Sequence, residues 1–210
     1  MSPYRPIAVT AILTTLLLAG CGTGDSQAPT SETTTGTTAA TPEATDAPST
    51  GEVSEGVAAQ YATLAEEVEA EGGRATSGDW EVAYIVEPAE PWFETPAGDP
   101  TRREPTTGET HHLEIIPIEA ATGRIVPDVP ILLEVLDDTG EVVDGKELMF
   151  FHAEFFHYAN NFSIPTAGDY TLRATLQPPQ SPRHGESLEQ LTLLEPATVT
   201  FDDVRLEPTT

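Results

Sequence analysis

The sequence of 210 residues has one cysteine, Cys21, and only nine lysines and arginines. A single cysteine cannot form a disulfide within one chain. The nine basic residues face 35 aspartates and glutamates, so the formal net charge is −26. Nucleic acid is a poor partner for such a chain, because neutralising phosphates requires clustered Lys and Arg. An acidic surface attracts cations and keeps an exported protein soluble, but it selects no particular partner.

Long apolar runs are also absent, apart from one near the N-terminus. Residues 7–18 form an apolar run with three threonines in it, preceded by Arg5. The run is too short to cross a bilayer and has the length of a signal-peptide core. It ends in Leu-Ala-Gly-Cys at residues 18–21, which resembles the site where a lipoprotein signal peptide is cut before a lipidated cysteine. We therefore predict a lipoprotein signal peptide over residues 1–20 and a lipid anchor at Cys21.

This prediction has two consequences. The mature protein would be extracytoplasmic and anchored to the cell membrane, at the cell surface or on the periplasmic side. With Cys21 used for the anchor, a blue-copper site is excluded, because such a site needs a cysteine thiolate.

The segment after the anchor has no aromatic and no large aliphatic residue from Gly22 to Gly51. Such a segment cannot bury enough apolar surface to offset its ordering entropy. We predict a lipidated, disordered linker over residues 21–55. A short helix and lead-in follow over residues 56–78, because apolar residues recur at helical spacing until Gly72 and Gly73.

From residue 79 onward the apolar pattern has the period of two that is typical of strands. About seven short strands are predicted, the clearest at residues 80–86, 111–118, 131–136, 170–176 and 197–206, with turns at 122–123 and 137–140. The 131–136 run is apolar throughout and suits a strand buried on both faces. Residues 95–109 form a Pro, Gly and Thr loop. Tyr170 after Gly168 and Asp169 is typical of a tyrosine corner, so residues 79–210 are predicted to form an all-β, immunoglobulin-like antiparallel sandwich.

The most informative stretch is residues 149–161, which read MFFHAEFFHYANN. It contains His152, His157, a carboxylate, two asparagines and four phenylalanines that could form an aromatic wall. A second histidine-rich run lies at residues 111–114, where strand alternation places His112 and Glu114 on one face and His111 on the other. Imidazole and carboxylate groups are ligands of divalent transition metals, so we expect these two segments to meet around one metal ion.

Each histidine has a plain alternative. His157 alone would suit a core position bonded to a backbone carbonyl, and His184 follows a proline-rich loop where most histidines are simply exposed. His152 is a possible ligand, or a residue that holds the stretch in place. Asn160 and Asn161 are candidates for hydrogen bonds to the ligands or for a turn.

The order of these motifs resembles a known family. The shared features are HLE at residues 112–114, LM at 148–149, HY-x-x-N at 157–161, G-x-Y at 168–170, and RH at 183–184 in a proline-rich loop. Together they resemble the periplasmic iron-transport proteins, also called the thirty-four-kilodalton membrane-antigen lipoprotein family, over residues 80–206. The resemblance implies an immunoglobulin-like, often dimeric protein, not an enzyme, that assists a membrane iron permease.

The same resemblance implies a site for a divalent metal, copper above all, with iron, zinc and manganese as alternatives. Carried onto this sequence, its ligands are His112, Glu114, His157 and His184. The family also has a methionine about seven residues before the histidine of HY, where this chain has Phe150, or Phe151 with one gap. Met149 is displaced by one or two positions, and its side chain is expected to point elsewhere.

The sequence is also compatible with two other classes of protein. His-x-Glu followed by a distant His is also the facial triad of non-haem iron oxygenases, which usually have a basic residue that holds an acidic co-substrate. The third reading is an immunoglobulin-like interaction lipoprotein whose histidines are structural and which binds no metal in stoichiometric amounts.

Overall fold

A computed structural model describes residues 53–95 and 98–208. The predicted signal peptide, the predicted anchor at Cys21 and nearly all of the predicted linker lie outside these residues. Among the helices of the described segments, none is long and apolar enough to cross a membrane.

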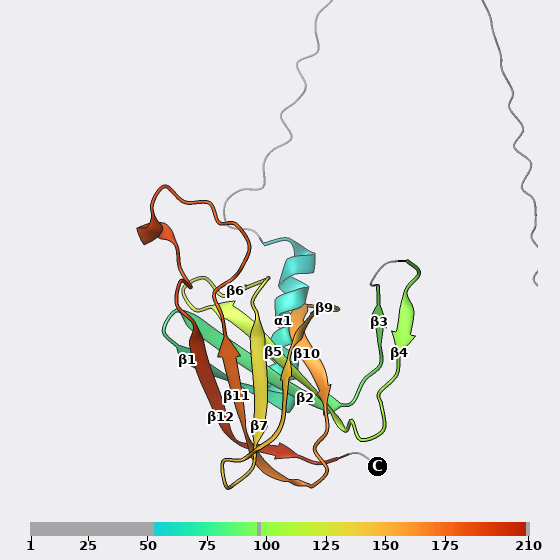
Figure 1. Ribbon diagram of the computed structural model, residues 1–210. Helices are drawn as coiled ribbons and strands as arrows, with labels where there is room; N and C mark the ends of the chain where they lie inside the picture. The colour runs from blue at the N-terminus through green and yellow to red at the C-terminus, as the bar shows by residue number, and fades with distance from the viewer. Residues whose placement is uncertain (1–52, 96–97, 209–210) are drawn as a thin grey trace, which may run out of the picture. The chain divides into compact units, whose positions relative to one another are not determined.

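The protein is built mainly of antiparallel strands, as Figure 1 shows. The larger sheet has six strands, in the order β1-β2-β5-β10-β9 with β6 paired to one end of β5. Its strands are β1 (Gly72–Ser77), β2 (Trp80–Pro88), β5 (His111–Glu119), β6 (Arg124–Ile125), β9 (Met149–His152) and β10 (Phe156–Phe162).

The second sheet has four strands in the order β12-β11-β7-β8. Its strands are β7 (Ile131–Leu136), β8 (Val142–Glu147), β11 (Gly168–Leu176) and β12 (Ala197–Leu206). The two sheets bury one shared apolar core between them, to which the larger sheet contributes Leu113 and Ile115 and the smaller one Leu133 and Leu172. The predicted antiparallel β-sandwich is confirmed.

The predicted tyrosine corner is present at the start of β11. The Tyr170 hydroxyl donates a hydrogen bond of 2.7 Å to the carbonyl of Thr166, four residues upstream. The tyrosine ring is buried against the shared core. This bond fixes the entry of β11 into the smaller sheet, as it does in immunoglobulin-like sandwiches.

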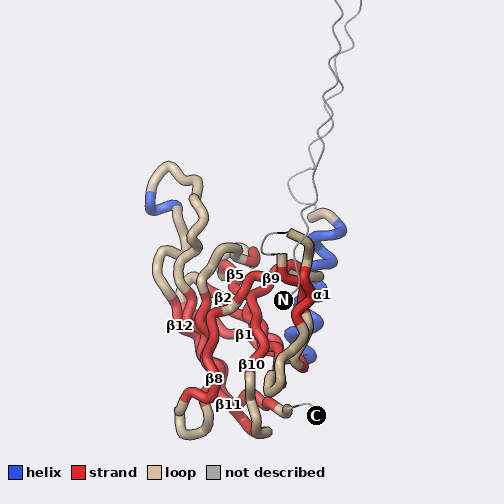
Figure 2. Tube along the Cα trace, turned by 45° about the vertical axis from the view of Figure 1, so that its right-hand side comes forward, coloured by secondary structure: helices blue, strands red, loops and turns tan. Residues whose placement is uncertain are grey.

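The outer face of the larger sheet has a cover of its own, the helix α1 (Glu55–Glu71). Its buried residues Leu64 and Val68 pack in a second apolar cluster with Ile85, Ile116 and other outward-facing residues of β2 and β5. Figure 2 shows α1 beside the strands rather than between the two sheets. The segment 56–78 therefore packs as part of the folded unit, since β1 also pairs with β2 along its whole length.

Gly72 lies where α1 ends and β1 begins. A Cβ atom at this position would lie 1.9 Å from the carbonyl oxygen of Tyr84, so only glycine allows this close approach of β1 to β2.

Two local expectations differ from the structure. The expected loop at residues 95–109 contains part of a hairpin, in which β3 (Trp92–Glu94) pairs with β4 (Thr101–Arg103). The strand at residues 131–136 is not buried on both faces along its length, because Leu132 is 40% exposed on the outer side of the smaller sheet, although Leu136 at its end is buried. Nothing among the described elements covers that side, and an apolar sequence alone does not reveal this.

Candidate metal centre

The candidate site lies on the outer face of the larger sheet, beside the area that α1 covers. On β5, Leu113 and Ile115 point into the shared core, so His112 and Glu114 point outward. On β10, Tyr158 and Phe162 point into the core, so His157 points outward, on the same face as His112 and Glu114. The predicted alternation of residues 111–115 is therefore what the structure has.

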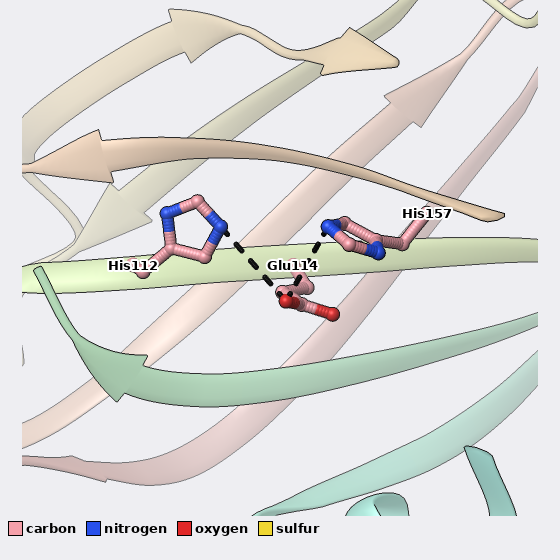
Figure 3. A group of neighbouring side chains, drawn as sticks. All are labelled: His112, Glu114 and His157. Atoms are coloured by element: carbon pink, nitrogen blue, oxygen red, sulfur yellow. Dashed lines mark ion pairs between the residues drawn. The ribbon is translucent and has the colours of Figure 1, made fainter. Parts of the chain in front are cut away.

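His112, Glu114 and His157 come together as a buried group, shown in Figure 3. Oxygen Oε1 of Glu114 lies 3.8 Å from Nε2 of His112 and 3.5 Å from Nε2 of His157. One potential ligand atom from each residue lies within 4.8 Å of the other two. Atoms bound to one ion at ~2.1 Å are up to about 4.2 Å apart, so a small inward movement would let one ion contact all three.

The electrostatics of the group suit a cation. Burial, and then the repulsion from Glu87 and Glu67, raise the pKa of the Glu114 carboxyl to about 8. Burial and the neighbouring His112 lower the pKa of His157 to about 4. Burial also lowers the pKa of His112, so both imidazoles are neutral near pH 7, which is the form that binds metals.

Two buried polar atoms of the group have no hydrogen-bond partner among the described residues. They are Oε2 of Glu114 and Nδ1 of His157. A buried polar atom without a partner is costly, and a bound ion or water would remove part of that cost. The donor set therefore fits a divalent metal on chemistry as well as on distance.

Aromatic side chains surround the group on two sides. Phe151 stacks on His157 with ring centroids 5.4 Å apart, and Phe155 meets the same imidazole at 5.6 Å. Trp92 of the hairpin lies 6.2 Å from the His112 ring and 5.6 Å from that of Phe151. Such apolar walls limit solvent access and lower the local dielectric.

Only half of the predicted aromatic wall forms. Phe150 and Phe156 lie on the opposite side of their strands and stack on each other, with centroids 5.3 Å apart, and they are 46% and 39% exposed. The reason is the alternation of β9 and β10, which turns every second side chain away from the three candidate ligands, although Phe150 still contributes to the lining of the cavity.

The group opens into a cavity of about 1000 Å³ whose lining is strongly acidic. No described Lys or Arg lines this cavity. Burial, and next the repulsion from Glu90, raise the pKa of Glu87 to about 7. The glutamates of the lining come from α1, β2, the β2–β3 connection, β3, β5 and the β9–β10 connection, namely Glu67, Glu87, Glu90, Glu94, Glu114 and Glu154.

The structure separates two expected ligands from the group. His152 pairs in register with Phe156, and its ring lies 5.0 Å from that ring, on the side of β9 that faces away from His157, although it also lines the cavity. His184 is exposed in the loop that leads to the short helix η1 (Leu188–Gln190), and it does not line the cavity. Figure 1 shows η1 and its loop far from the β3–β4 hairpin. His111 lies on the inner face, as expected.

The expectation for Met149 was wrong. Its register partner is Ala159, and the partner of Phe151 is His157, so Met149 and Phe151 share the face of the ligands. Ala159 also pairs with Glu114, which places Glu114, Ala159 and Met149 in one row across three strands. Met149 lines the cavity and is 37% exposed.

Several residues of the site were not found from the sequence. Trp92 lies in the β3–β4 hairpin, and Glu87 lies in β2, next to β5. No local sequence pattern reveals that β3 pairs with β4 or that β2 pairs with β5. The role of Asn161 was anticipated: its side-chain oxygen lies 2.9 Å from Nδ1 of His112.

Fold and site together define a class of protein: an antiparallel β-sandwich that carries a buried group of two histidines and one glutamate in an acidic cavity. Residues 108–205 match the model of the family described as Fe2+ transport protein. The resemblance inferred from the sequence motifs is thereby confirmed over that segment.

Solved structures show the same fold. A copper-bound variant of FetP from uropathogenic Escherichia coli strain F11 has 20% identity and a TM-score of 0.52, and the match covers 66% of this chain and 92% of that one. A copper-bound variant of P19 from Campylobacter jejuni has 20% identity and a TM-score of 0.52, over 67% and 98% of the two chains. The as-isolated FetP of the same E. coli strain has 22% identity and a TM-score of 0.50, over 65% and 96%. No curated protein matches this chain in sequence.

Proposed function

We propose that this protein is a membrane-tethered, extracytoplasmic metal-binding protein that assists iron uptake through a membrane iron permease. The observation that carries the proposal is the buried group of His112, Glu114 and His157 at the base of an acidic cavity. The family match over residues 108–205 supports the link to iron.

Copper is the metal we propose for the group, with iron, zinc and manganese as competitors. Two imidazoles and one carboxylate suit Cu(II) and the neighbouring divalent ions, and copper leads the Irving–Williams order. The similar FetP and P19 variants were solved with copper. Met149 is the thioether that this chain offers, since it lies one ~4.8 Å strand spacing beyond the small Ala159 on the ligand face.

The anchor and the linker place the site near a permease. A lipid at Cys21 would hold the chain at the membrane, and the linker predicted over residues 21–55 would let the folded unit reach a neighbouring membrane protein. Replacement of Cys21 by Ser should move the protein from the membrane fraction to the soluble fraction. A Cys21→Ser variant that stays in the membrane fraction would contradict the anchor.

We further propose that a second copy of the chain completes the site with its His184. Within one chain His184 lies away from the group, although the family resemblance includes a histidine of this loop among the ligands. Strand β9 is an edge strand that presents the exposed rings of Phe150 and Phe156 beside the cavity, which is a surface suited to a second copy. In this arrangement His184→Ala weakens metal binding only under conditions where the protein is dimeric, as measured by light scattering and metal titration together.

The donor set also favours a second candidate, because two histidines and one carboxylate are the facial triad of non-haem iron oxygenases. Those enzymes usually hold an acidic co-substrate with a basic residue. The cavity here is lined by glutamates and by no described basic residue, and so it would repel such a co-substrate. We therefore place binding and transfer of a cation above oxygenase chemistry.

The test is iron uptake in a strain that lacks the gene. Complementation with the wild-type chain should restore growth and accumulation of labelled iron under iron limitation, whereas His157→Ala should not. Equal rescue by both chains would mean that the metal site is not used in iron uptake. An interaction protein without metal would behave in that way.

A further inference from the structure

Asn161 is fully buried on the ligand face of β10, and its register partner on β5 is His112. Its side-chain amide lies between this metal ligand and the base of the β3–β4 hairpin. Glu90 and Glu109 flank the hairpin at that base, and the amide contacts both of them.

All four hydrogen-bonding positions of this amide are used. Oxygen Oδ1 accepts the backbone N–H of Glu90 at 3.1 Å and faces Nδ1 of His112 at 2.9 Å. Nitrogen Nδ2 donates to the carbonyl of Glu90 at 2.8 Å and, over a longer 3.5 Å, to the Glu109 carboxylate. A flipped amide would set donor against donor and acceptor against acceptor at Glu90, so the orientation is fixed.

The fixed orientation determines the tautomer of His112. Because Oδ1 can only accept, Nδ1 of His112 must carry the proton and donate it. The lone pair is then on Nε2, the nitrogen that lies 3.8 Å from Glu114. The amide therefore prepares His112 to bind an ion on the side of Glu114 and His157.

The same amide holds the hairpin over the site. Its two bonds to the backbone of Glu90 fix the chain two residues before Trp92, whose ring faces His112. On the other strand, Arg103 lies over the Trp92 ring at 4.0 Å and bonds the Glu109 carboxylate at 2.6 Å. Glu109 is thus tied to both the hairpin and the amide.

We propose that Asn161 is a positioning residue that couples metal binding at His112 to closure of the β3–β4 hairpin. The inference rests on the proposed metal site. One amide sets both the nitrogen that His112 presents and the place of Trp92 over the cavity. Coupling of this kind is reciprocal: a bound ion that holds His112 also holds the hairpin closed, and a closed hairpin favours binding.

The experiment compares Asn161→Ala with Asn160→Ala in the full chain. Asn160 is a matched control, because its side chain bonds the carbonyl of Glu147 and the backbone N–H of Asn161, but neither the ligands nor the hairpin. Copper affinity is measured by competition with a chelator, and hairpin closure by acrylamide quenching of Trp92 with and without copper. Trp80 is 2% exposed and therefore contributes little to quenching, which Trp92→Phe verifies.

We expect Asn161→Ala to weaken copper binding by about 10- to 100-fold, the usual effect of losing a residue that orients a ligand. It should raise the quenching of Trp92, and copper should no longer suppress that quenching. Asn160→Ala should match the wild type in both measurements. Wild-type affinity together with wild-type quenching in Asn161→Ala would overturn the proposal.

A second variant separates the two roles of the amide and serves if Asn161→Ala does not fold. Arg103→Met removes the tie between Trp92 and Glu109 but leaves the bond between Asn161 and His112. It should raise the quenching of Trp92 and weaken copper binding by less than Asn161→Ala does. Unchanged quenching in Arg103→Met would contradict the role of the hairpin as a cover. If the wild type bound no copper, the proposed function would fail, whereas increased quenching in the metal-free variants would still support the role of the amide at the hairpin.

Discussion

Phe151 lies directly opposite His157 across the β9–β10 pair, and the two rings stack with their planes 6° from parallel. The strand position closest to this ligand is therefore apolar. It is also the position that the family methionine takes when one gap is allowed. The buried group itself offers two nitrogens and one oxygen, which favours Cu(II) and similar ions over Cu(I), and the thioether nearest to it on the ligand face is that of Met149.

Phe151→Met should shift the site toward Cu(I). A thioether at this position would lie beside the His157 imidazole, and soft sulfur ligands select Cu(I). We expect Cu(I) affinity to rise at least tenfold, measured by competition with a Cu(I) chelator. Phe150→Met is the matched control, because residue 150 points away from the ligands. An equal gain in both variants would show that the thioether acts somewhere other than at the site.

Met149→Leu tests whether the thioether that is present reaches the ion. Leucine keeps the apolar bulk and removes the sulfur, so Cu(I) affinity should fall while Zn(II) and Cu(II) affinities stay within about twofold. The measurement is a parallel titration with the three ions. Unchanged Cu(I) affinity would exclude Met149 from the ligand set.

Metal affinity should depend on pH through Glu114. Its pKa of about 8 means that the carboxyl is protonated near pH 7, so binding releases a proton. His157, with a pKa of about 4, is already neutral there. Affinity should rise about tenfold per pH unit from pH 6.5 to 8 and then level off. Titrations at several pH values check this, and Glu114→Gln should bind weakly with no such slope.

The metal-free protein should become less stable as the pH rises through the same range. The pKa of Glu114 is about 8 in the folded protein and 4.5 in the unfolded chain. Its protonated form therefore stabilises the fold at low pH, and this stabilisation is lost as the pH rises from 4.5 through 8. Glu87 acts in the same direction up to about pH 7. The pKa of His157 is lowered from 6.5 to about 4 on folding. This shift makes stability rise with pH, but only below pH 6.5.

Between pH 6.5 and 8 the Glu114 contribution therefore dominates, at about 1.4 kcal/mol per pH unit. Urea unfolding at pH 6.5 and 8 measures it, with Glu114→Gln as the variant in which most of the drop should disappear. A stability that is flat or rising across this interval would contradict the protonation of buried Glu114.

The sequence predicted most of this fold because it depends on alternation that can be read locally. The strands at residues 111–118, 170–176 and 197–206 show it, and the same rule placed His112 with Glu114. What could not be read is pairing between strands. The register of β9 against β10 decides that Met149 faces the ligands and His152 does not, and no local pattern encodes that register.

The hairpin was missed for a related reason. Its strands are only three residues each and lie in a Pro- and Gly-rich segment, so the propensity signal is weak. Trp92 packs against the rings of His112 and Phe151, which belong to other strands, and such contacts leave no local pattern in the sequence. His184, taken from the family pattern, is exposed and lies outside the buried group of this chain.

The most direct test of the account is a metal titration of the full chain with copper and zinc at 0.15 M salt, where exposed acidic surface is screened. His157→Ala is compared with His152→Ala, which changes a histidine on the opposite side of the adjacent strand. We predict one tightly bound ion per chain, affinity reduced by more than about 100-fold in His157→Ala, and wild-type affinity in His152→Ala. Binding that is only weak and nonstoichiometric, or that is the same in all three proteins, would contradict the metal site.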